Sequence, residues 1–483
     1  MHPSGLHRVT ADRPWPLFDV STTRRIEHEA AAALAPHALM QRAGLAVARL
    51  AAAIAPHART VWIACGPGNN GGDGLEAALH LRRWGRDVTL TLEGGTDALP
   101  PDAAAAWARC AQAGIGRSQQ PPASWDLAID ALLGIGHARP LSGAMAATVR
   151  ALNGGAAPVL AVDIPSGLAA DTGTGDSVRA THTLALLTLK PGLFTAQGRD
   201  AAGQVWVDPL GVALPQVPSA WLSGPPAPVR RPHATHKGSY GDVGVVGGAP
   251  GMAGAAVLAA MGALDAGAGR VFLGLLDAAA VPLVPTLPEL MVRDAGTLPL
   301  ETLTVACGCG GGDRVAAALP DILRRSARLV LDADGLNALA AAPDLVEALL
   351  ARAAGGAPTV LTPHPLEAAR LLGSTTADVQ GYRLAAARDL AARFGCAVVL
   401  KGSGTVIAAP GRVPAINPTG NARLATGGTG DVLAGLVAAA LAAGAGAFDA
   451  ACAAVYRHGA LADAWPPHLP LTAGALAAAA TPG

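Results

Sequence analysis

An aspartate directly behind a run of glycines is the most chemically suggestive feature of this sequence. The segment Gly427-Gly428-Thr429-Gly430-Asp431 leads into the apolar stretch 432–443, which predicts a loop followed by the start of a helix. Backbone N–H groups and the positive pole of the helix dipole meet at such a point and favour an anion. A carboxylate there can take a proton from a hydroxyl group while the N–H groups hold the phosphoryl group that it attacks. The alternative is that Asp431 only caps the helix.

A second glycine-rich segment lies near the other end of the chain, between a strand-like stretch at 60–65 and a helix-like stretch at 75–84. It reads Gly66-Pro67-Gly68-Asn69-Asn70-Gly71-Gly72-Asp73-Gly74. This arrangement predicts a phosphate-binding turn at the carboxyl edge of a sheet, although it matches neither the dinucleotide-binding fingerprint nor a Walker loop. The alternative is a flexible turn without a ligand.

Polar side chains follow further strand-like stretches of the first half. Asp130, Asp163 and Ser166 all come at such ends, and Lys190 closes another. Carboxyl ends of parallel strands meet in one crevice, so we expect Asn70 to lie with them. Hard oxygen ligands suit an alkali or alkaline-earth cation. The alternatives are that each acid is a cap or turn residue and that Lys190 extends to solvent.

The second half shows the same pattern. Asp332 and Asp334 end one strand-like stretch, and His364 follows another between two prolines, which favours a ligand contact over a place in the core. Lys401 begins a segment that can bind a nucleotide phosphate through its ammonium group and backbone.

Length and composition limit the class of protein. The chain has 483 residues, enough for two or three domains. Its formal net charge is zero and 14% of residues are charged, which argues against binding to nucleic acid or a membrane surface. No signal peptide or membrane span is evident, and six scattered cysteines indicate a reduced, cytoplasmic protein. Cys307 and Cys309 have no partner pair nearby in the sequence, so we expect no metal there.

Alternation of short apolar strands with helices predicts an α/β protein of two domains. We place the first, a Rossmann-like doubly wound sheet, at residues 1–212. Residues 213–235 are rich in proline and read as a linker, and residues 236–483 form the second domain.

The motifs of the first half resemble those of the NAD(P)H-hydrate epimerase domain: GPGNNGGDG at 66–74, the segment 130–136, VDIPSGL at 162–168 and the strand ending at Lys190. The HKG-x-x-G motif at 236–241 and the later motifs resemble the ADP-dependent NAD(P)H-hydrate dehydratase, which has a ribokinase-like α/β/α sandwich fold. The order of the motifs is that of the bifunctional NAD(P)H-hydrate repair enzymes. This resemblance implies repair of hydrated nicotinamide cofactors: epimerisation of R and S NAD(P)HX, then dehydration of the 6S form with ADP, giving AMP and phosphate.

The resemblance also implies site residues. For the epimerase it implies Asp163 as the acid/base and a potassium site at Asn70, Asp130 and Ser166. The implied epimerase substrate contacts are Asn69, Asn70, Gly71, Gly72, Asp73, Gly134, Ile135, Gly136, His137, Ala138, Arg139, Pro140 and Asp163. For the dehydratase it implies Asp431 as the base, with hydrate contacts at Ala255, Gly308, His364 and Asp431. The implied nucleotide contacts are Lys401, Gly402, Ser403, Gly404, Thr405 and Gly430.

Three positions depart from the family motifs: Ile135 in Gly-Thr-Gly, Cys309 in Gly-Pro-Gly, and Leu366 in His-Pro-Gly-Glu. The resemblance further implies Mg²⁺ with the ADP, small-molecule substrates only and a homo-oligomer. One alternative is a ribokinase-like kinase of a vitamin precursor. Another is that the first domain is a non-catalytic binding module.

Overall fold

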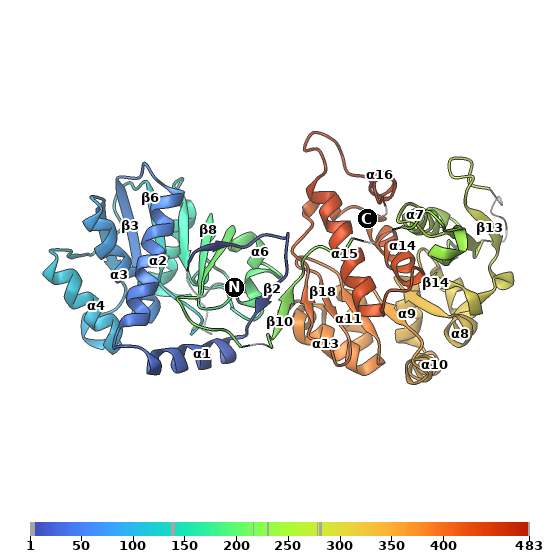
Figure 1. Cartoon of the computed structure of the whole chain (residues 1–483), viewed down its shortest axis with the longest axis horizontal. Coiled ribbons are helices and arrows are strands. Elements are labelled where there is room, and N and C mark those ends of the chain that lie inside the picture. Colours follow the sequence, from blue (N-terminus) through green and yellow to red (C-terminus); the bar gives the residue numbers. More distant parts are fainter. Residues whose placement is uncertain are drawn as a thin grey trace. The chain divides into compact units, whose positions relative to one another are not determined.

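The computed structural model describes residues 5–136, 141–215, 217–228, 231–277, 279 and 283–481. The chain divides into two compact units, each built around its own sheet (Figure 1). The first comprises Met1–Thr10 and Trp15–Ala220, and the second comprises Ala11–Pro14 and Trp221–Gly483.

In the first unit, helices alternate with the strands of a sheet of order β1-β9-β8-β7-β6-β3-β4-β5. All neighbours in this sheet are parallel except β1 and β9. The strands of this sheet are β1 (His7–Arg8), β3 (Thr60–Cys65), β4 (Asp87–Leu92), β5 (Arg117–Ser118), β6 (Leu127–Ala131), β7 (Val159–Val162), β8 (His182–Leu186) and β9 (Gln204–Asp208), and the short strand β2 (Trp15–Leu17) is not part of it. The helices are α1 (Val20–Ala33), α2 (Ala38–Ile54), α3 (Asn69–Arg83), α4 (Pro101–Gln112), α5 (Gly143–Gly154) and α6 (Gly198–Ala201).

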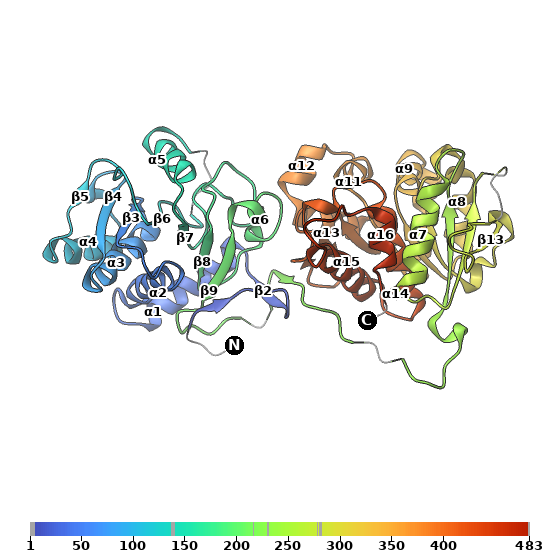
Figure 2. The ribbon, with the colours of Figure 1, turned by 90° about the horizontal axis from the view of Figure 1, so that it is seen from above.

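Helices cover both faces of this sheet, as the sequence predicts. Helices α2, α3 and α4 pack on one face, while Val149 and Leu152 of α5 join a separate core cluster with Trp62 (Figure 2). Buried apolar strands between two helical layers are typical of parallel sheets. The predicted doubly wound α/β class is therefore confirmed for this unit.

The predicted extent of the glycine-rich turn is wrong, because α3 already begins at Asn69. The glycines at the start of α3 permit close packing and do not serve to provide unusual backbone angles. A Cβ on Gly74 would lie 2.6 Å from Cβ of Ala131 on β6. One on Gly44 of α2 would lie 2.1 Å from Cβ of Glu76 on α3. The sequence pattern for a turn and for a tightly packed glycine-rich helix start is the same.

The second unit has a larger sheet, of order β13-β12-β11-β14-β15-β16-β17-β18-β19-β10. Pairing is parallel from β13 to β17, whereas β18 is antiparallel to both its neighbours. The strands are β10 (Ala220–Leu222), β11 (Asp242–Gly247), β12 (Arg270–Leu275), β13 (Met291–Asp294), β14 (Thr304–Cys307), β15 (Arg328–Leu331), β16 (Thr359–Leu361), β17 (Ala397–Leu400), β18 (Val406–Ala408) and β19 (Ala415–Ile416). The helices are α7 (Ala253–Asp265), α8 (Val315–Arg325), α9 (Asp334–Ala341), α10 (Pro343–Ala354), α11 (Pro365–Leu372), α12 (Thr376–Gly381), α13 (Arg383–Phe394), α14 (Thr429–Ala442), α15 (Ala447–Asp463) and α16 (Ala473–Ala478).

Two helical layers cover this sheet as well (Figure 1). Helices α7, α14, α15 and α16 pack together on one face, and α8, α9, α10, α11 and α13 lie on the other. Small residues let α7 and α14 approach closely: a Cβ on Gly435 would lie 2.0 Å from the carbonyl oxygen of Ala259. The α/β class is confirmed here too, and β10 lies inside the proline-rich segment that the sequence indicates as a linker.

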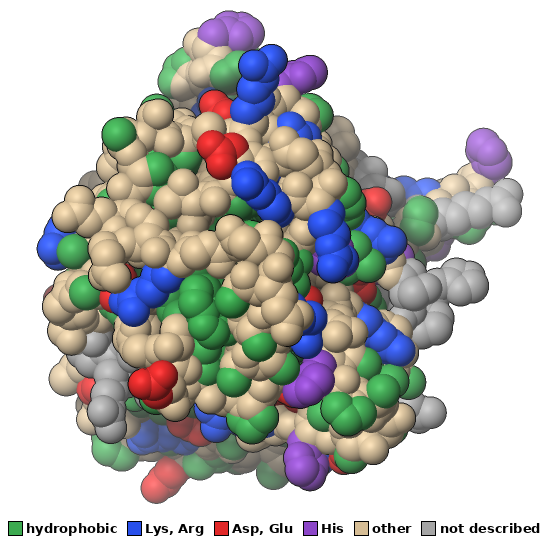
Figure 3. Space-filling model, turned by 90° about the vertical axis from the view of Figure 1, so that its left-hand side faces the viewer, with side chains coloured by type: hydrophobic (Ala, Val, Ile, Leu, Met, Phe, Trp, Pro, Cys, Tyr) green, Lys and Arg blue, Asp and Glu red, His purple; other side chains and the backbone are tan. Residues whose placement is uncertain are grey.

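On the face of the molecule in Figure 3, the described residues form no extended patch of a single charge. The described residues of the face in Figure 3 show basic, acidic and hydrophobic side chains interspersed. Among the described residues, none of the helices combines the length and apolar character needed to cross a membrane.

Candidate functional site

A cavity of about 740 Å³ in the first unit collects most of the polar residues predicted there. It lies at the carboxyl ends of β3, β6, β7 and β8, where the sequence predicts a crevice. The predicted residues that line it are Asn69, Asn70, Asp73, Gly134, Ile135, Gly136 and Asp163. Gly71 and Gly72 are buried in α3 beneath it, and His137, Ala138, Arg139 and Pro140 lie outside the described residues.

Asp163 and Lys190 form a buried ion pair at this cavity. Nζ of Lys190 donates hydrogen bonds to Oδ1 of Asp163 and, at 2.9 Å, to the carbonyl oxygen of Leu186. The Lys190 side chain has no exposed surface, so the interpretation that it extends to solvent is wrong. Asp163 has a φ of 68°, which is rare for a residue with a side chain and often marks a functional site.

Asp130 and Ser166 are held together just behind the cavity wall. Oγ of Ser166 donates to Oδ1 of Asp130 at 2.6 Å, and the Ser166 N–H donates to Oδ2 at 2.8 Å. Burial raises the pKa of Asp130 to about 6. Asn70 lies nearer the cavity, and its buried Nδ2 has no hydrogen-bond partner among the described residues.

Sequence reasoning missed the opposite wall of this cavity. It is formed by residues of α1, α2 and α4, including Thr23, Arg24, Glu27, His28, Met40 and Asp102. Burial and the negative charge of Asp163 raise the pKa of Glu27. Burial also raises the pKa of Asp73 well above its usual value, and the negative charges of Asp163 and Glu27 add to this effect. Helix α1 comes about 100 residues before β6 in the chain, so spacing gives no sign that its polar face meets these strand ends.

In the second unit, Asp431 lies in the first turn of α14, as the sequence predicts. The helix begins after Gly428, whose φ of 92° makes the tight turn, and the capping position makes no side-chain hydrogen bond. Asp431 is therefore not the cap. The turn is fixed by Oγ1 of Thr429, which donates to the carbonyl of Leu424 at 2.8 Å, and by the buried ring of His458, whose Nε2 lies 2.9 Å from the carbonyl oxygen of Thr429.

Charged and polar groups surround the Asp431 carboxylate. Nζ of Lys401 donates to Oδ1 of Asp332 at 2.7 Å, and Oγ1 of Thr362 donates to the same oxygen at 2.8 Å. Ligand atoms of Asp332, Asp431 and Cys309 all lie within 4.8 Å of one another. Burial and the charge of Asp332 raise the pKa of Asp431 to about 6, against the lowering effects of the Cys309 hydrogen bond and Lys401.

His364 and Glu367 begin α11 beside this cluster. Nδ1 of His364 accepts from the N–H of Leu366 at 3.1 Å, and its Nε2 lies 3.1 Å from Oε1 of Glu367. Burial raises the pKa of Glu367 to about 7, although Lys401 opposes the shift. The His364 side chain is 45% exposed, so it remains open to a ligand.

The remaining predicted residues lie around the same strand ends. Gly430 is near Lys401, since a Cβ built on it would lie 3.5 Å from Nζ. Gly308, with a φ of 114°, packs its Cα against the backbone of Asp332, and a Cβ on Gly310 would lie 2.9 Å from Cβ of Ala255. The predicted nucleotide-binding segment follows Lys401 directly: Gly402 and Ser403 are exposed, Gly404 is buried and Thr405 is partly buried.

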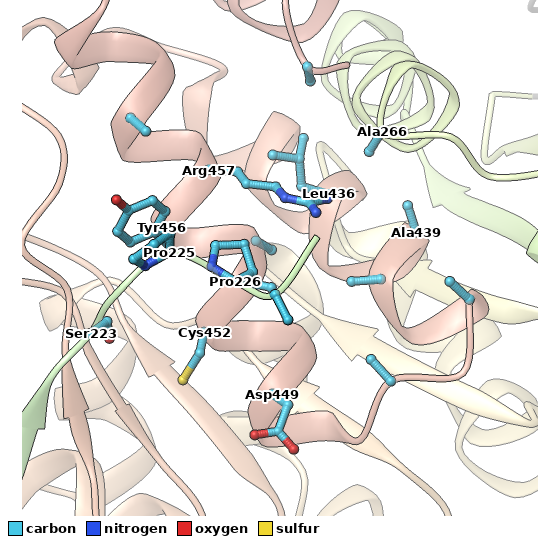
Figure 4. Close-up of a pocket in the computed structure, with 18 of the residues that line it drawn as sticks. Ser223, Pro225, Pro226, Ala266, Leu436, Ala439, Asp449, Cys452, Tyr456 and Arg457 are labelled. Carbon is cyan, nitrogen blue, oxygen red and sulfur yellow. The ribbon is translucent and has the colours of Figure 1, made fainter. Parts of the chain in front are cut away.

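A second large cavity, of about 820 Å³, lies elsewhere in this unit (Figure 4). It is mostly apolar and lies between α14, α15 and residues 223–227, with Leu436 and Ala439 on one wall and Cys452 and Tyr456 on another. Arg457 extends from α15 towards Leu436. None of the ligand-binding residues predicted from the sequence lines it, so we place the catalytic chemistry at Asp431 instead.

Comparison with known proteins identifies the family. A family profile described as "YjeF-related protein N-terminus" matches residues 36–192, and one described as "NAD(P)H-hydrate dehydratase" matches residues 243–479. The chain is 38% identical over 477 residues to the "Bifunctional NAD(P)H-hydrate repair enzyme Nnr" of Escherichia coli K12, covering 93% of this chain and 90% of that protein. It belongs to the family of bifunctional NAD(P)H-hydrate repair enzymes.

Other similar proteins match either the whole chain or about half of it. The repair enzyme of Thermofilum pendens is 35% identical over 483 residues, with 92% of this chain and 91% of that protein covered. Among solved structures, an "ADP/ATP-dependent NAD(P)H-hydrate dehydratase" of Bacillus subtilis is 31% identical and covers 52% of this chain and 91% of its own, with a TM-score of 0.42. The family resemblance inferred from the motifs is confirmed, and the vitamin-kinase alternative is not supported, because the full-length relatives match both halves of the chain.

Proposed function

We propose that the chain repairs hydrated nicotinamide cofactors in two steps, with one active site in each unit. The first unit interconverts the R and S forms of NAD(P)HX, and the second dehydrates the 6S form to NAD(P)H at the expense of ADP. The observation that carries the proposal is the carboxylate of Asp431 at the start of α14, beside the Asp332–Lys401 ion pair. An acid, a cation and helix N–H groups in one place fit phosphoryl transfer to a hydroxyl.

In the epimerase step, Asp163 is the acid/base. Its left-handed backbone and the ion pair with Lys190 fix its carboxylate at the cavity wall, so that it can take a proton from the hydrated ring and return one. Asn69, Asn70, Asp73 and Gly134–Gly136 line the cavity and would bind the dinucleotide. The polar groups of α1, with Asp102 of α4, would close the other side.

A potassium ion fits the residues behind this cavity. Asn70, Asp130 and Ser166 offer an amide, a carboxylate and a hydroxyl oxygen, which are the hard donors that such an ion prefers. The buried carboxylate of Asp130, with the Ser166 hydroxyl oxygen 2.6 Å from its Oδ1, supports this assignment. The ion would supply positive charge close to the substrate phosphates and would favour the ionised form of Asp130.

In the dehydratase step, Asp431 removes the proton from the hydroxyl group of the hydrate. The hydroxyl oxygen attacks the β-phosphorus of ADP, the bond to the bridging oxygen breaks, and AMP leaves. Loss of phosphate from the modified ring, together with a ring proton, then restores the dihydronicotinamide. The N–H groups at the start of α14 hold the migrating phosphoryl group, and Lys401 offsets its charge.

Mg²⁺ is the metal that we expect with the nucleotide, where it would neutralise phosphate charge. The carboxylates of Asp332 and Glu367 beside Lys401 are hard oxygen donors that fit this ion. Gly402–Thr405 and Gly430 would contact the nucleotide, while Ala255, Gly308 and His364 would contact the hydrate. We assign the epimerase to residues 1–212 and the dehydratase to residues 236–483.

We also propose a cytoplasmic location and a homo-oligomer. The six free cysteines, of which all but the partly exposed Cys452 are buried, fit a reducing compartment. Light scattering of the purified protein measures the oligomeric state.

The decisive assay supplies the purified protein with a racemic mixture of NADHX and ADP. We expect complete conversion to NADH, with one AMP and one phosphate released for each NADH. Conversion that stops when the 6S form is used up would contradict the epimerase assignment. NADH formation without ADP consumption would contradict the proposed dehydratase mechanism.

A further inference from the structure

The Asp431 cluster contains a sulfur ligand. Cys309 follows β14, and its thiol sulfur lies within 4.8 Å of a carboxylate oxygen of Asp431. Cys309 and Asp332 are each 1% exposed, so water competes little for their ligand atoms. Cys309 replaces the proline of the family motif, so the thiol is a property of this chain rather than of the motif. The prediction that no metal would bind at Cys307 and Cys309 considered only neighbours in sequence, whereas the fold adds two carboxylates.

We propose that Cys309, Asp332 and Asp431 form a site for a thiophilic divalent cation such as Zn²⁺. One thiolate and two carboxylates give the three protein ligands of an open tetrahedral zinc site, with water in the fourth position. In such a site the ligand atoms lie about 3.5 Å apart. In the structure they lie within 4.8 Å of one another, so binding of the metal would require small side-chain rotations.

The surroundings of the cluster favour a dication. Both hydrogen bonds that the structure gives the Asp332 carboxylate end on Oδ1, which leaves Oδ2 for a metal. Lys401 balances only one of the two carboxylate charges. On binding, the Cys309 thiol releases its proton to solvent as the Zn–S bond forms, and the resulting thiolate with the two carboxylates, Lys401 and Zn²⁺ is neutral overall. The positive φ of Gly308 and Gly310 fixes the backbone on both sides of Cys309.

Occupancy of this site removes the proposed base from the reaction, because Asp431 cannot accept a proton while it binds the metal. We therefore expect Zn²⁺ to inhibit the dehydratase and to leave the epimerase active. The inhibition rests on the proposed role of Asp431, whereas metal binding itself does not.

The test uses Co²⁺ as a spectroscopic substitute for Zn²⁺ in the full-length protein. Wild type should show a near-ultraviolet thiolate-to-cobalt charge-transfer band that Zn²⁺ abolishes, and Cys309→Ser should lack it. Cys307→Ser is the matched control, because Cys307 is equally buried two residues away but outside the cluster, and it should keep the band. If Cys309→Ser is unstable, Cys309→Ala is the second variant, and ADP-dependent dehydration in the absence of added metal shows that the second unit is folded.

The activity measurement follows the same variants. Zn²⁺ should inhibit wild type and Cys307→Ser alike, with reversal by a chelator, and Cys309→Ser should need at least about tenfold more Zn²⁺. No charge-transfer band in wild type, or an unchanged band in Cys309→Ser, would overturn the site. A normal band together with a Zn²⁺-insensitive dehydratase would keep the site but refute the role of Asp431 as the base.

Discussion

The substitution Asp332→Asn should move the acid limb of the dehydratase pH profile to lower pH. The Asp431 carboxylate must be ionised to act as a base, and its pKa is raised to about 6 by burial and by the charge of Asp332. Wild-type kcat/KM should therefore fall as the pH drops through about 6. Removing the negative charge of Asp332 stabilises the ionised form of Asp431, so the acid limb of the profile moves to lower pH.

The size of the shift follows from Coulomb's law. At 4.8 Å and an effective dielectric constant of about 20, two like unit charges repel by about 3.5 kcal/mol, or about 2.5 pKa units. Lys401, 2.7 Å from Asp332, remains in place in the variant, so its attraction for the Asp431 carboxylate does not reduce the effect of the substitution. We therefore expect the limb to move down by about two pH units.

The assay is dehydration of the 6S hydrate with excess ADP, over a pH range that brackets the wild-type limb. Asp334→Asn is the control, because Asp334 is the weakest of the influences on the pKa of Asp431 and should move the limb much less. A limb that stays in place or moves to higher pH in Asp332→Asn would refute the assignment of this limb to Asp431.

Further predictions concern both units. Asp163→Asn should reduce epimerisation by about 10²- to 10⁴-fold and leave dehydration of the 6S hydrate unchanged, as separate assays of each step would show. Lys190→Met should destabilise the first unit by about 3–5 kcal/mol in urea unfolding, because it leaves a buried carboxylate unpaired, and the double variant with Asp163→Asn should recover part of the loss. Replacing K⁺ with a bulky organic cation should slow only the epimerase step; an unchanged rate would argue against the potassium site. Gly308→Ala should cost at least about 1–3 kcal/mol in thermal unfolding and impair the dehydratase, since its Cβ would lie 2.0 Å from the carbonyl oxygen of Asp332, while Gly254→Ala has open space and should be tolerated.

Local pattern was sufficient to predict the architecture. Alternation of apolar strands and helices located β3 at its observed bounds and placed Asp431 in the first turn of a helix. The pattern failed at the Asn69–Gly74 segment, because glycines required for close helix packing read the same as glycines of a turn. The two-residue strands β1, β5 and β19 are held mainly by their neighbours, which no short window of sequence reveals.

Site residues at strand ends were predictable, but their partners were not. The rule that parallel strands end in one crevice brought Asn70 and Asp163 to one cavity. The same rule gave no role to Cys309, whose neighbours Asp332 and Asp431 are distant in sequence and close only in the fold. Glu27 was missed for the same reason, because only tertiary packing carries its helix to the cavity.

The most direct test of the account is Asp431→Asn, assayed for both steps on the same preparation. We predict that ADP-dependent dehydration of the 6S hydrate falls by about 10²- to 10⁴-fold while epimerisation continues at the wild-type rate. Dehydration within tenfold of the wild-type rate would contradict the claim that this carboxylate removes the hydroxyl proton.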